Sequence, residues 1–332
     1  MKIIKWGILG TGRIAGKFAG DLQFAESCEL IAVGSRSQQG ADEFGDKFSV
    51  KYRHASYKEL AQNPEVDVIY IATPHNSHYE NTILCLNNHK AVLCEKPFAI
   101  NTLQALEMIN LAIEKKVFLM EALWTKFHPH YIKMQAMLQQ GLLGEIKAVI
   151  ANFGFKPLAP VNPRLYEPEL GGGTIMDIGI YNVFMAMSIL GKPDHIEAVM
   201  TPAPTGVDEQ CAILFGYKNG AMAQLFSTFS ANLATDMDIC GTEARIRLTS
   251  RFYDTSATIE FYEGRDAEKQ IIPIEKEGGT GYQYEARHVN ECLRNSLTES
   301  PVIPFAATIE LMETLDKVRH IAGVRYPADS QI

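Results

Sequence analysis

The chain has 332 residues, of which 46% are hydrophobic, and this is enough sequence for two domains with cores of their own. Its formal net charge is −8, and no run of basic residues exceeds a pair, so we expect no nucleic-acid partner. The six cysteines form neither a Cys-x-x-Cys pair nor a Cys/His cluster, which favours reduced thiols in a cytoplasmic protein and no metal site. We expect no membrane partner either, because the N-terminus lacks the long apolar region of a signal peptide and no apolar run reaches membrane-spanning length.

The N-terminal strand and helix are joined by a glycine-rich turn. Residues 3–9 form an apolar run, residues 10–15 read Gly-Thr-Gly-Arg-Ile-Ala, and a helical pattern follows. In such a turn the first glycine permits the tight bend, and the second lets the backbone approach a pyrophosphate at the helix N-terminus. The alternative is a glycine-rich turn that binds nothing. The pattern predicts a dinucleotide site that includes Gly10, Thr11, Gly12, Arg13 and Ile14.

The second predicted strand, residues 29–34, ends in Ser35-Arg36-Ser37. Proteins that prefer NAD usually carry an acidic residue here, which binds the ribose 2′-hydroxyl. An arginine between two hydroxyls instead suits a 2′-phosphate, because the guanidinium fork matches phosphate oxygens. The alternative is that Arg36 stacks on the adenine. We therefore predict that Ser35 and Arg36 bind NADP, with NAD as the other possibility.

Polar residues also follow the next two predicted strands. The strand at 66–72 leads into Thr73-Pro74-His75-Asn76-Ser77-His78, and the buried run from residue 91 leads into Glu95-Lys96-Pro97. Ligands of open α/β sheets bind at the carboxyl ends of the strands. Proline after Lys96 keeps that lysine out of helical geometry and is compatible with a cis turn. The alternatives without a role in binding are histidines that make their hydrogen bonds within the fold, and a Glu-Lys pair on the surface. We expect the cofactor crevice to be lined by Thr73, Pro74, His75, His78, Glu95 and Lys96.

After about residue 123 the pattern changes from alternating strands and helices to a series of strands. Strand-like runs occupy 146–155, 196–201, 210–217, 221–230, 244–249, 257–262 and 269–274, and helical patterns occupy 131–140, 282–297 and 306–322. Asn219-Gly220 is a strong hairpin signal. The prediction is an α/β protein: residues 1–123 form a Rossmann domain with a doubly wound parallel sheet, and residues 124–332 form an α+β domain with a mainly antiparallel sheet. At the junction, Trp124 belongs either to the core, the commoner case, or to the wall of an apolar substrate site.

One segment of the second domain combines three glycines with an acid and a phenol. Gly171-Gly172-Gly173 precede an apolar helical pattern that ends at Gly191, and within it Asp177 and Tyr181 are four residues apart. On a helix they share one face, and each is costly to bury without a partner. Either Tyr181 bonds Asp177 inside the core, or the two handle protons at the cleft between the domains.

These motifs together resemble the glucose-fructose oxidoreductase/inositol dehydrogenase (Gfo/Idh/MocA) family over essentially the whole chain. The motifs on which the resemblance rests are the glycine turn at 10–15, Glu-Lys-Pro at 95–97, and the Asp-x-Gly-x-Tyr helix at 177–181. Residues 121–127 and 171–181 look most similar to the dimeric dihydrodiol dehydrogenase subgroup. Many members carry histidine where this chain has Tyr181, which argues against an inositol dehydrogenase. The resemblance implies an open-faced sheet in the second domain, bound NAD(P), and Lys96 in the catalytic position.

The expected reaction is hydride transfer between the nicotinamide and a secondary alcohol or ketone of a diol, sugar or related polyol. A protein group must share the proton of the reacting hydroxyl, and this is either Lys96 or Tyr181. Glu95 would orient Lys96, and Asp177 would hold Tyr181 or a substrate hydroxyl. We expect substrate contacts from Trp124, Arg164 and Tyr181. Two other functions remain open: a cofactor-binding regulator on the same fold, and a glycosidase that uses bound NAD transiently.

The predicted sheet of the second domain also has a face that needs a cover. Along residues 221–230, Met222, Gln224, Phe226 and Thr228 alternate with the residues of the opposite face. An exposed apolar sheet face is an aggregation hazard. We therefore expect a homodimer through this sheet.

Overall fold

The computed structural model describes residues 2–265 and 268–331. The chain divides into two compact units. Unit 1 combines the residues up to Trp124 with Glu277–Ile309, and unit 2 combines Thr125–Lys276 with the residues from Glu310 onward. The first break lies beside the predicted boundary at residue 123. The return of 277–309 to unit 1 was not predicted from the sequence.

The sheet of unit 1 is parallel throughout, with the strand order β3-β2-β1-β4-β5-β6. This is the order of a doubly wound Rossmann sheet, and it reverses between β1 and β4, where such folds bind their ligand. Every residue of β4, β5 and β6 is buried, as expected of parallel strands covered on both faces. The strands are β1 (Ile4–Leu9), β2 (Cys28–Gly34), β3 (Tyr52–His54), β4 (Val68–Ile71), β5 (Ala91–Glu95) and β6 (Leu119–Ala122).

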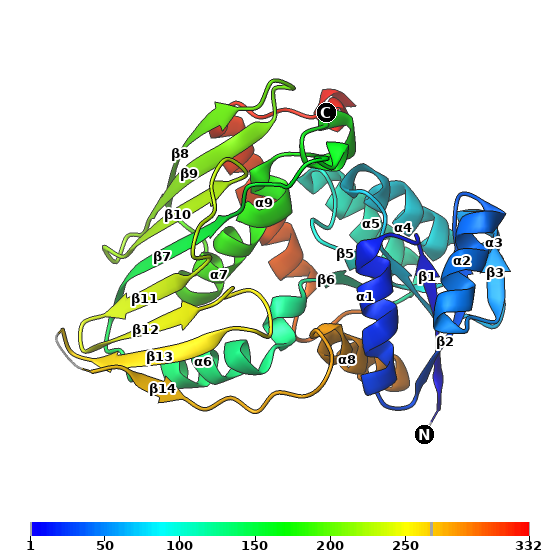
Figure 1. Ribbon diagram of the computed structural model, residues 1–332, viewed down its shortest axis with the longest axis horizontal. Coiled ribbons are helices and arrows are strands. Elements are labelled where there is room, and N and C mark those ends of the chain that lie inside the picture. Colours follow the sequence, from blue (N-terminus) through cyan, green and yellow to red (C-terminus); the bar gives the residue numbers. More distant parts are fainter. Residues whose placement is uncertain (1, 266–267, 332) are drawn as a thin grey trace. The chain divides into compact units, whose positions relative to one another are not determined.

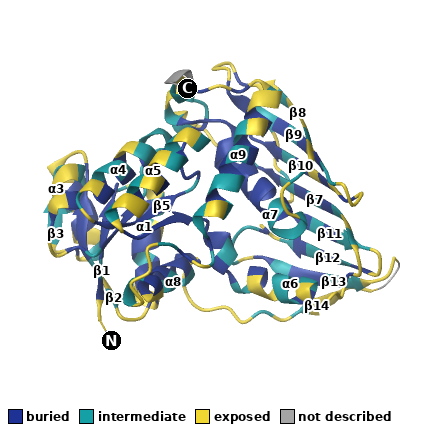
Figure 2. Cartoon of the chain, turned by 180° about the vertical axis from the view of Figure 1, so that it is seen from behind, coloured by how far each residue is buried: buried dark blue, intermediate teal, exposed yellow. Residues whose placement is uncertain are grey.

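Two groups of helices accompany this sheet. Helix α1 packs against α2 and α8, whereas α4 packs against α3 and α5. In Figure 2, α4 and α5 show exposed residues along one side and buried residues along the other, the pattern of helices that cover a core. The helices are α1 (Arg13–Asp21), α2 (Gln38–Phe48), α3 (Tyr57–Gln62), α4 (His78–Asn87), α5 (Thr102–Lys115) and α8 (Tyr282–Arg294).

Helix α8 is held in unit 1 by a carboxylate at the end of α1. Asp21 accepts hydrogen bonds from the backbone N–H groups of Thr280 and Tyr282 and from the Thr280 hydroxyl, at 2.8–3.0 Å. A carboxylate at a helix N-terminus satisfies amides that have no partner in the helix. Farther along α8, Asn290 accepts a hydrogen bond from the indole of Trp6 on β1 at 2.9 Å. The late segment therefore completes the core of unit 1.

The sheet of unit 2 has the order β14-β13-β12-β11-β7-β10-β9-β8, seen in Figure 1 as the green and yellow strands. All neighbours are antiparallel except β7 and β10, which are parallel, so the predicted mainly antiparallel sheet is confirmed. The hairpin at Asn219-Gly220 is also present, between β9 and β10. The strands are β7 (Ile146–Gly154), β8 (His195–Pro202), β9 (Asp208–Gly216), β10 (Met222–Thr228), β11 (Met237–Gly241), β12 (Ala244–Thr249), β13 (Thr258–Glu263) and β14 (Gln270–Ile272).

Helix α7 (Ile180–Leu190) packs on β7 and β10 and is buried over its first seven residues, dark blue in Figure 2. The other helices of this part are α6 (Pro129–Gln139) and α9 (Phe305–Ala322), and the division between the units falls inside α9. The segment Pro168–Leu190 has the length and hydropathy of a membrane span, contrary to our expectation, but 67% of its apolar window is buried inside the protein. It is the core helix segment of unit 2.

The opposite face of this sheet exposes apolar side chains. Met222 is 55% exposed on β10, Leu214 is 44% exposed on β9, and Val199 is 69% exposed on β8. Residues paired across strands point to the same face, and Gln224 pairs with Leu214, so these positions belong to one surface. Thr228 points to the same face through its pairing with Gln210, but it is fully buried and donates to the Gln210 side chain. The predicted alternation therefore holds for all four positions of β10, and the exposed part of the face ends before Thr228.

Candidate active site

The glycine turn lies between β1 and α1, at the point where the strand order reverses. Gly10 has φ +103°, and a Cβ there would lie 2.8 Å from the carbonyl oxygen of Ala72, so the fold itself requires this glycine. At Gly12, the residue that caps α1, a Cβ would meet nothing within 4 Å. Gly12 thus leaves open space in front of the exposed N–H groups of α1. This arrangement fits a dinucleotide pyrophosphate.

The end of β2 presents one exposed cation. The hydroxyl of Ser37 caps α2 by accepting from the backbone N–H of Gly40 at 3.2 Å, and Ser35 is buried. Arg36 between them is exposed. One of the two predicted hydroxyls therefore caps the helix, and Arg36 is exposed beside it.

The loop after β4 is tied to the turn after β5 by His78. This histidine is fully buried; its Nδ1 lies 2.8 Å from the carbonyl oxygen of Pro97, and its Nε2 lies 3.0 Å from that of Thr73. Carbonyl oxygens only accept, so a neutral ring donates to one of them and a protonated ring to both. His75 is also buried, with its ring centroid 5.9 Å from that of His78. His78 thus orients the backbone of two loops, and a cofactor contact for either histidine stays a prediction.

Lys96 stands at the end of β5, on a backbone that Glu95 holds. The Lys96–Pro97 peptide is cis, as the sequence suggested. The buried carboxylate of Glu95 accepts from the Tyr70 hydroxyl and from the backbone N–H of Lys96, the latter at 3.1 Å. Burial, together with the negative charge of Glu95, raises the pKa of Tyr70 well above its usual range, so Tyr70 is a permanent donor. Glu95 therefore contacts the main chain of Lys96.

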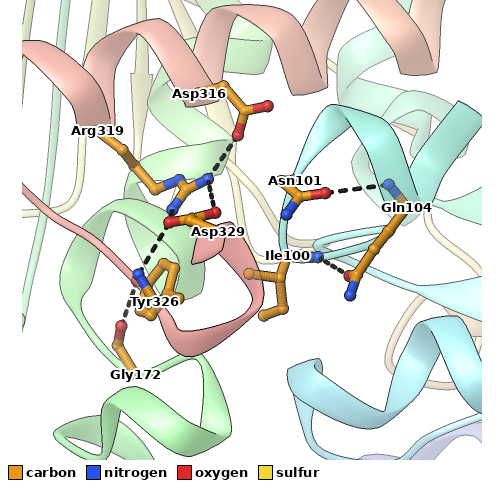
Figure 3. Close-up of polar contacts among 8 residues, drawn as sticks. All are labelled: Ile100, Asn101, Gln104, Gly172, Asp316, Arg319, Tyr326 and Asp329. Atoms are coloured by element: carbon orange, nitrogen blue, oxygen red, sulfur yellow. Dashed lines mark hydrogen bonds and ion pairs between the residues drawn. The ribbon is translucent and has the colours of Figure 1, made fainter. Parts of the chain in front are cut away.

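The chain that leaves this turn is fixed by the cap of α5. The side chain of Asn101 accepts from the N–H of Gln104 at 3.0 Å, and the side chain of Gln104 accepts in return from the N–H of Ile100 at 3.2 Å (Figure 3). Such reciprocal bonds satisfy donors at a helix start. The backbone is consequently anchored on both sides of Lys96.

In unit 2, the predicted helix begins with a π-helical turn, Ile175–Gly179, before α7. Asp208 anchors this turn by accepting from the Thr174 hydroxyl at 2.6 Å and from the N–H of Ile175 at 2.7 Å. Burial raises the pKa of Asp208 to about 6. Gly173 has φ +105°, and a Cβ there would lie 2.3 Å from Asp208 Oδ1. The glycines thus allow close approach of a carboxylate of the same unit, a partner that sequence reasoning missed.

A second anchor for the glycine segment comes from the C-terminal part of unit 2. The Tyr326 hydroxyl donates to the carbonyl oxygen of Gly172, and Arg319 binds Asp316 at 2.6 Å and Asp329 at 2.8 Å (Figure 3). The N–H of Tyr326 donates to Asp329 at 2.9 Å. This network fixes the backbone from which the π-helical turn starts.

Two predicted site residues, Asp177 and Arg164, meet in unit 2. Arg164 donates to Asp177 Oδ1 at 3.0 Å, and Asp177 is buried. Tyr181 is buried as well, with its ring centroid 4.9 Å from that of Tyr253 and 6.0 Å from that of Phe153. Tyr253 and Phe153 are stacked on each other at 4.4 Å. These two aromatic residues, distant in sequence from 171–181, were not identified from the sequence.

Trp124 belongs to an aromatic chain in unit 1. It is buried and stacks on Tyr282 of α8 at a centroid distance of 4.4 Å. Tyr282 meets Phe18 edge-on, and Phe18 stacks on Tyr70 at 3.8 Å. The core alternative for Trp124 accounts for these contacts, and its contact with substrate stays a prediction.

Comparison with known sequences decides the family. Residues 4–123 match the sequence model described as the oxidoreductase family with an NAD-binding Rossmann fold, and residues 131–247 match that of the GFO/IDH/MocA C-terminal domain. The chain belongs to the GFO/IDH/MocA oxidoreductase family. The resemblance proposed from residues 10–15, 95–97 and 177–181 is confirmed, as is the predicted NAD(P)-binding oxidoreductase.

Relatives within the GFO/IDH/MocA family match along the whole chain. The trans-1,2-dihydrobenzene-1,2-diol dehydrogenase of Xenopus laevis is 38% identical over 97% of this chain and 99% of its own. The human protein of the same name is 35% identical over 99% of each chain. Among solved structures, a 3-ketoreductase from Actinomadura kijaniata, determined with NADP and TDP-benzene, superposes with a TM-score of 0.86 at 24% identity, covering 97% of this chain and 99% of its own. An aldose-aldose oxidoreductase from Caulobacter crescentus superposes with a TM-score of 0.88 at 22% identity, covering 97% and 98%. These two structures confirm the fold.

Proposed function

We propose that this oxidoreductase is an NADP-dependent dehydrogenase of vicinal diols or sugars. The observation that carries the proposal is Lys96 at the carboxyl end of β5, on a backbone fixed by Glu95, His78 and the cap of α5. The diol dehydrogenase relatives of equal length support the diol, and the aldose-aldose oxidoreductase among the structural neighbours supports a sugar.

The cofactor would be held by residues of unit 1. The N–H groups at the start of α1 would bind the pyrophosphate above the open space at Gly12, and Arg36 would bind the 2′-phosphate. When bound, the nicotinamide accepts or supplies the hydride. The chain must then position the hydroxyl and hold its proton.

Proton handling falls to Lys96 and Tyr181 in this proposal. Lys96 shares the proton of the reacting hydroxyl, because it follows the carboxyl end of β5, where sheets of this kind bind their ligands. Tyr181 and the Asp177–Arg164 pair bind the substrate's other hydroxyls, because the paired carboxylate keeps a fixed orientation. Buried neighbours on Tyr181 exclude water from its ring.

A substrate panel tests the function. Vicinal diols, aldoses and keto sugars are offered with NADP and with NADPH, and absorbance of the reduced nicotinamide is followed. We expect turnover with at least one diol or sugar and faster turnover with the phosphorylated cofactor. Release of free sugar from a glycoside without net absorbance change would instead identify a glycosidase, and cofactor binding without turnover of any compound would identify a regulator.

We also propose that the protein is a cytoplasmic homodimer. The apolar surface of Val199, Leu214 and Met222 supports the dimer, because exposed apolar sheet faces are commonly covered. The cysteines form no Cys-x-x-Cys pair or Cys/His cluster, and this supports a cytoplasmic location, where thiols stay reduced.

A further inference from the structure

Three carboxyl groups lie in the core of unit 1 near the end of β5. Glu95 ends β5, Glu121 lies on β6, and Glu285 lies on α8. Glu121 is 1% exposed and Glu285 is fully buried. Buried carboxylates are rare unless they are paired or neutral. The reaction as proposed above uses Glu95 and leaves the other two without a role.

Glu121 is placed beside the β5 end by sheet register. It pairs with Cys94, directly before Glu95 and Lys96. Its Oε2 accepts from the Thr308 hydroxyl at 3.1 Å, whereas its Oε1 has no hydrogen-bond partner among the residues that the structure describes. The charged groups that act on it are Glu95 and Lys96. The Cys94 thiol is neutral, because burial raises its pKa well above the usual range.

Glu285 approaches Glu95 from a different element. Neither of its carboxyl oxygens has a hydrogen-bond partner within the described residues. The titratable groups that interact with it are Glu95 of β5 and Tyr70 of β4. No cation faces Glu285 among them. A buried carboxyl in such surroundings keeps its proton.

We propose that Glu121 is a positioning residue that sets the charge around Lys96, while Glu285 is a buried neighbour of Glu95 that does not take part. The proposal rests on the catalytic role of Lys96 only for its effect on rate. Burial, and next the charge of Glu95, raise the pKa of Glu121 to about 7 against the opposing effect of its hydrogen bonds and of Lys96. Below that pH Glu121 is uncharged, and above it Glu121 adds a negative charge beside Glu95 and Lys96.

The expected consequence concerns the proton on Lys96. A second negative charge favours the ammonium, so Glu121 in its ionised form holds the proton on Lys96 to higher pH. Glu121→Gln keeps the acceptor for Thr308 and removes this charge. It should lower the pH at which Lys96 loses its proton by about one unit. Glu285→Gln is the matched control: it makes the same isosteric change in the same cluster but removes no charge.

The decisive measurement is the ¹³C chemical shift of the lysine ε-carbon in ε-¹³C-lysine-labelled, substrate-free protein, with the Lys96 signal assigned through Lys96→Met. We expect a lower titration midpoint in Glu121→Gln and the wild-type midpoint in Glu285→Gln. Equal midpoints in wild type and Glu121→Gln would overturn the proposal, and so would an equal shift in both variants. Circular dichroism confirms that each variant is folded.

Kinetics provide the second measurement. In the direction of alcohol oxidation, kcat/KM is measured against pH. In Glu121→Gln the midpoint of this profile should shift to lower pH together with the Lys96 signal. In Glu285→Gln it should stay at the wild-type pH. A shifted Lys96 signal in a protein that oxidises no alcohol would refute the proposed dehydrogenase function while the charge-setting role stands. A shifted signal with an unchanged pH profile would show that Lys96 does not share the reacting proton.

Discussion

At the scale of single residues, the candidate site depends on how the backbone of Lys96 is held. Glu95 accepts from its N–H, and His78 contacts the carbonyl of Pro97. The sequence predicted that Glu95 would orient Lys96; in the structure Glu95 contacts the backbone N–H of Lys96, and its effect on the side chain stays a prediction. The contact is therefore made by the backbone of Lys96 and not by its ammonium.

Replacing Lys96 and Tyr181 separately should show which of them transfers the proton of the reacting hydroxyl. General acid–base catalysis by a side chain typically raises the rate of the chemical step by roughly 10²–10⁴-fold. Lys96→Met should therefore lower kcat by at least about a hundredfold while NADP still binds. Tyr181→Phe removes only the hydroxyl and should raise KM more than it lowers kcat if Tyr181 orients substrate.

Steady-state kinetics and fluorescence titration of NADPH check both variants. A Lys96→Met enzyme that retains more than about a tenth of the wild-type kcat would refute the assignment of Lys96. Greater damage from Tyr181→Phe would transfer the role to Tyr181.

Arg36 should decide between the two cofactors. It is exposed after β2, where an acidic residue would bind the hydroxyl of NAD. Arg36→Ala should weaken NADP binding about tenfold or more and leave NAD nearly unchanged, because only NADP carries the phosphate. Dissociation constants for both cofactors measure this, with Arg13→Ala as a comparison in the adjacent turn. If Arg36→Ala lowered the affinity for NADP and for NAD equally, a contact between Arg36 and the 2′-phosphate would be excluded.

At the scale of elements, the segment from Gly171 to α7 shows what a strand-and-helix pattern can and cannot convey. The apolar run and its stop at Gly191 predicted the helix, and α7 ends at Leu190. The π-helical turn at Ile175–Gly179 was not predicted, because it depends on Asp208 of β9 and on Tyr326. Partners that are close in space and distant in sequence leave no local periodicity.

Gly173→Ala tests whether the absence of a side chain at residue 173 is what allows Asp208 to lie against this turn. Both Gly173 and Gly206 have positive φ, but only Gly173 would bring a Cβ against a neighbouring atom. Each alanine should cost about 1–2 kcal/mol for its backbone conformation. Gly173→Ala should cost about 1–3 kcal/mol more for the overlap with Asp208. Urea unfolding of both variants measures the difference, and equal losses would contradict the proposed close approach.

Asp208 should also make stability depend on pH. Its pKa is about 6 in the folded protein and below 4 without burial, so the folded state binds the proton more tightly. The stability that this proton contributes is present at low pH and is lost as pH rises through about 6. Relative to Asp208→Asn, the wild-type free energy of unfolding should therefore fall between about pH 4 and pH 6, by as much as about 1.4 kcal/mol per pH unit. A pH-independent difference in urea midpoints would contradict this.

The predicted elements are most accurate where the pattern is local. The strands of both sheets and the turn at Gly10 follow from apolar runs and their glycines. The strands β3 and β11 were missed, because Arg53 and His54 in β3 and Asp238 in β11 interrupt any apolar run. The return of α8 to unit 1 was missed for another reason: its partners Asp21 and Trp6 lie more than 250 residues earlier.

At the scale of the whole molecule, the exposed sheet face gives the sharpest test of association. Met222→Lys and Leu214→Glu place charges on the surface formed by Val199, Leu214 and Met222. Burying a charge in an interface without a partner costs several kcal/mol, so both variants should sediment as monomers where wild type is a dimer. Ile113→Lys, at a 58% exposed position of α5 in unit 1, is the matched control and should not change the mass. A monomeric wild type at micromolar concentration would refute the dimer.

The anchoring of α8 by Asp21 and Trp6 has a consequence for biosynthesis. Unit 1 begins at the N-terminus yet needs Glu277–Ile309 to complete its core. A ribosome adding ~5–20 residues per second takes roughly 10–40 s to pass from the first part of this unit to the last. During that interval the indole of Trp6 and the ring of Phe18 lack their partners on α8. The nascent chain therefore displays an unfinished nucleotide-binding domain until Glu277–Ile309 has been synthesised, and the exposed apolar surface is of the kind that chaperones bind.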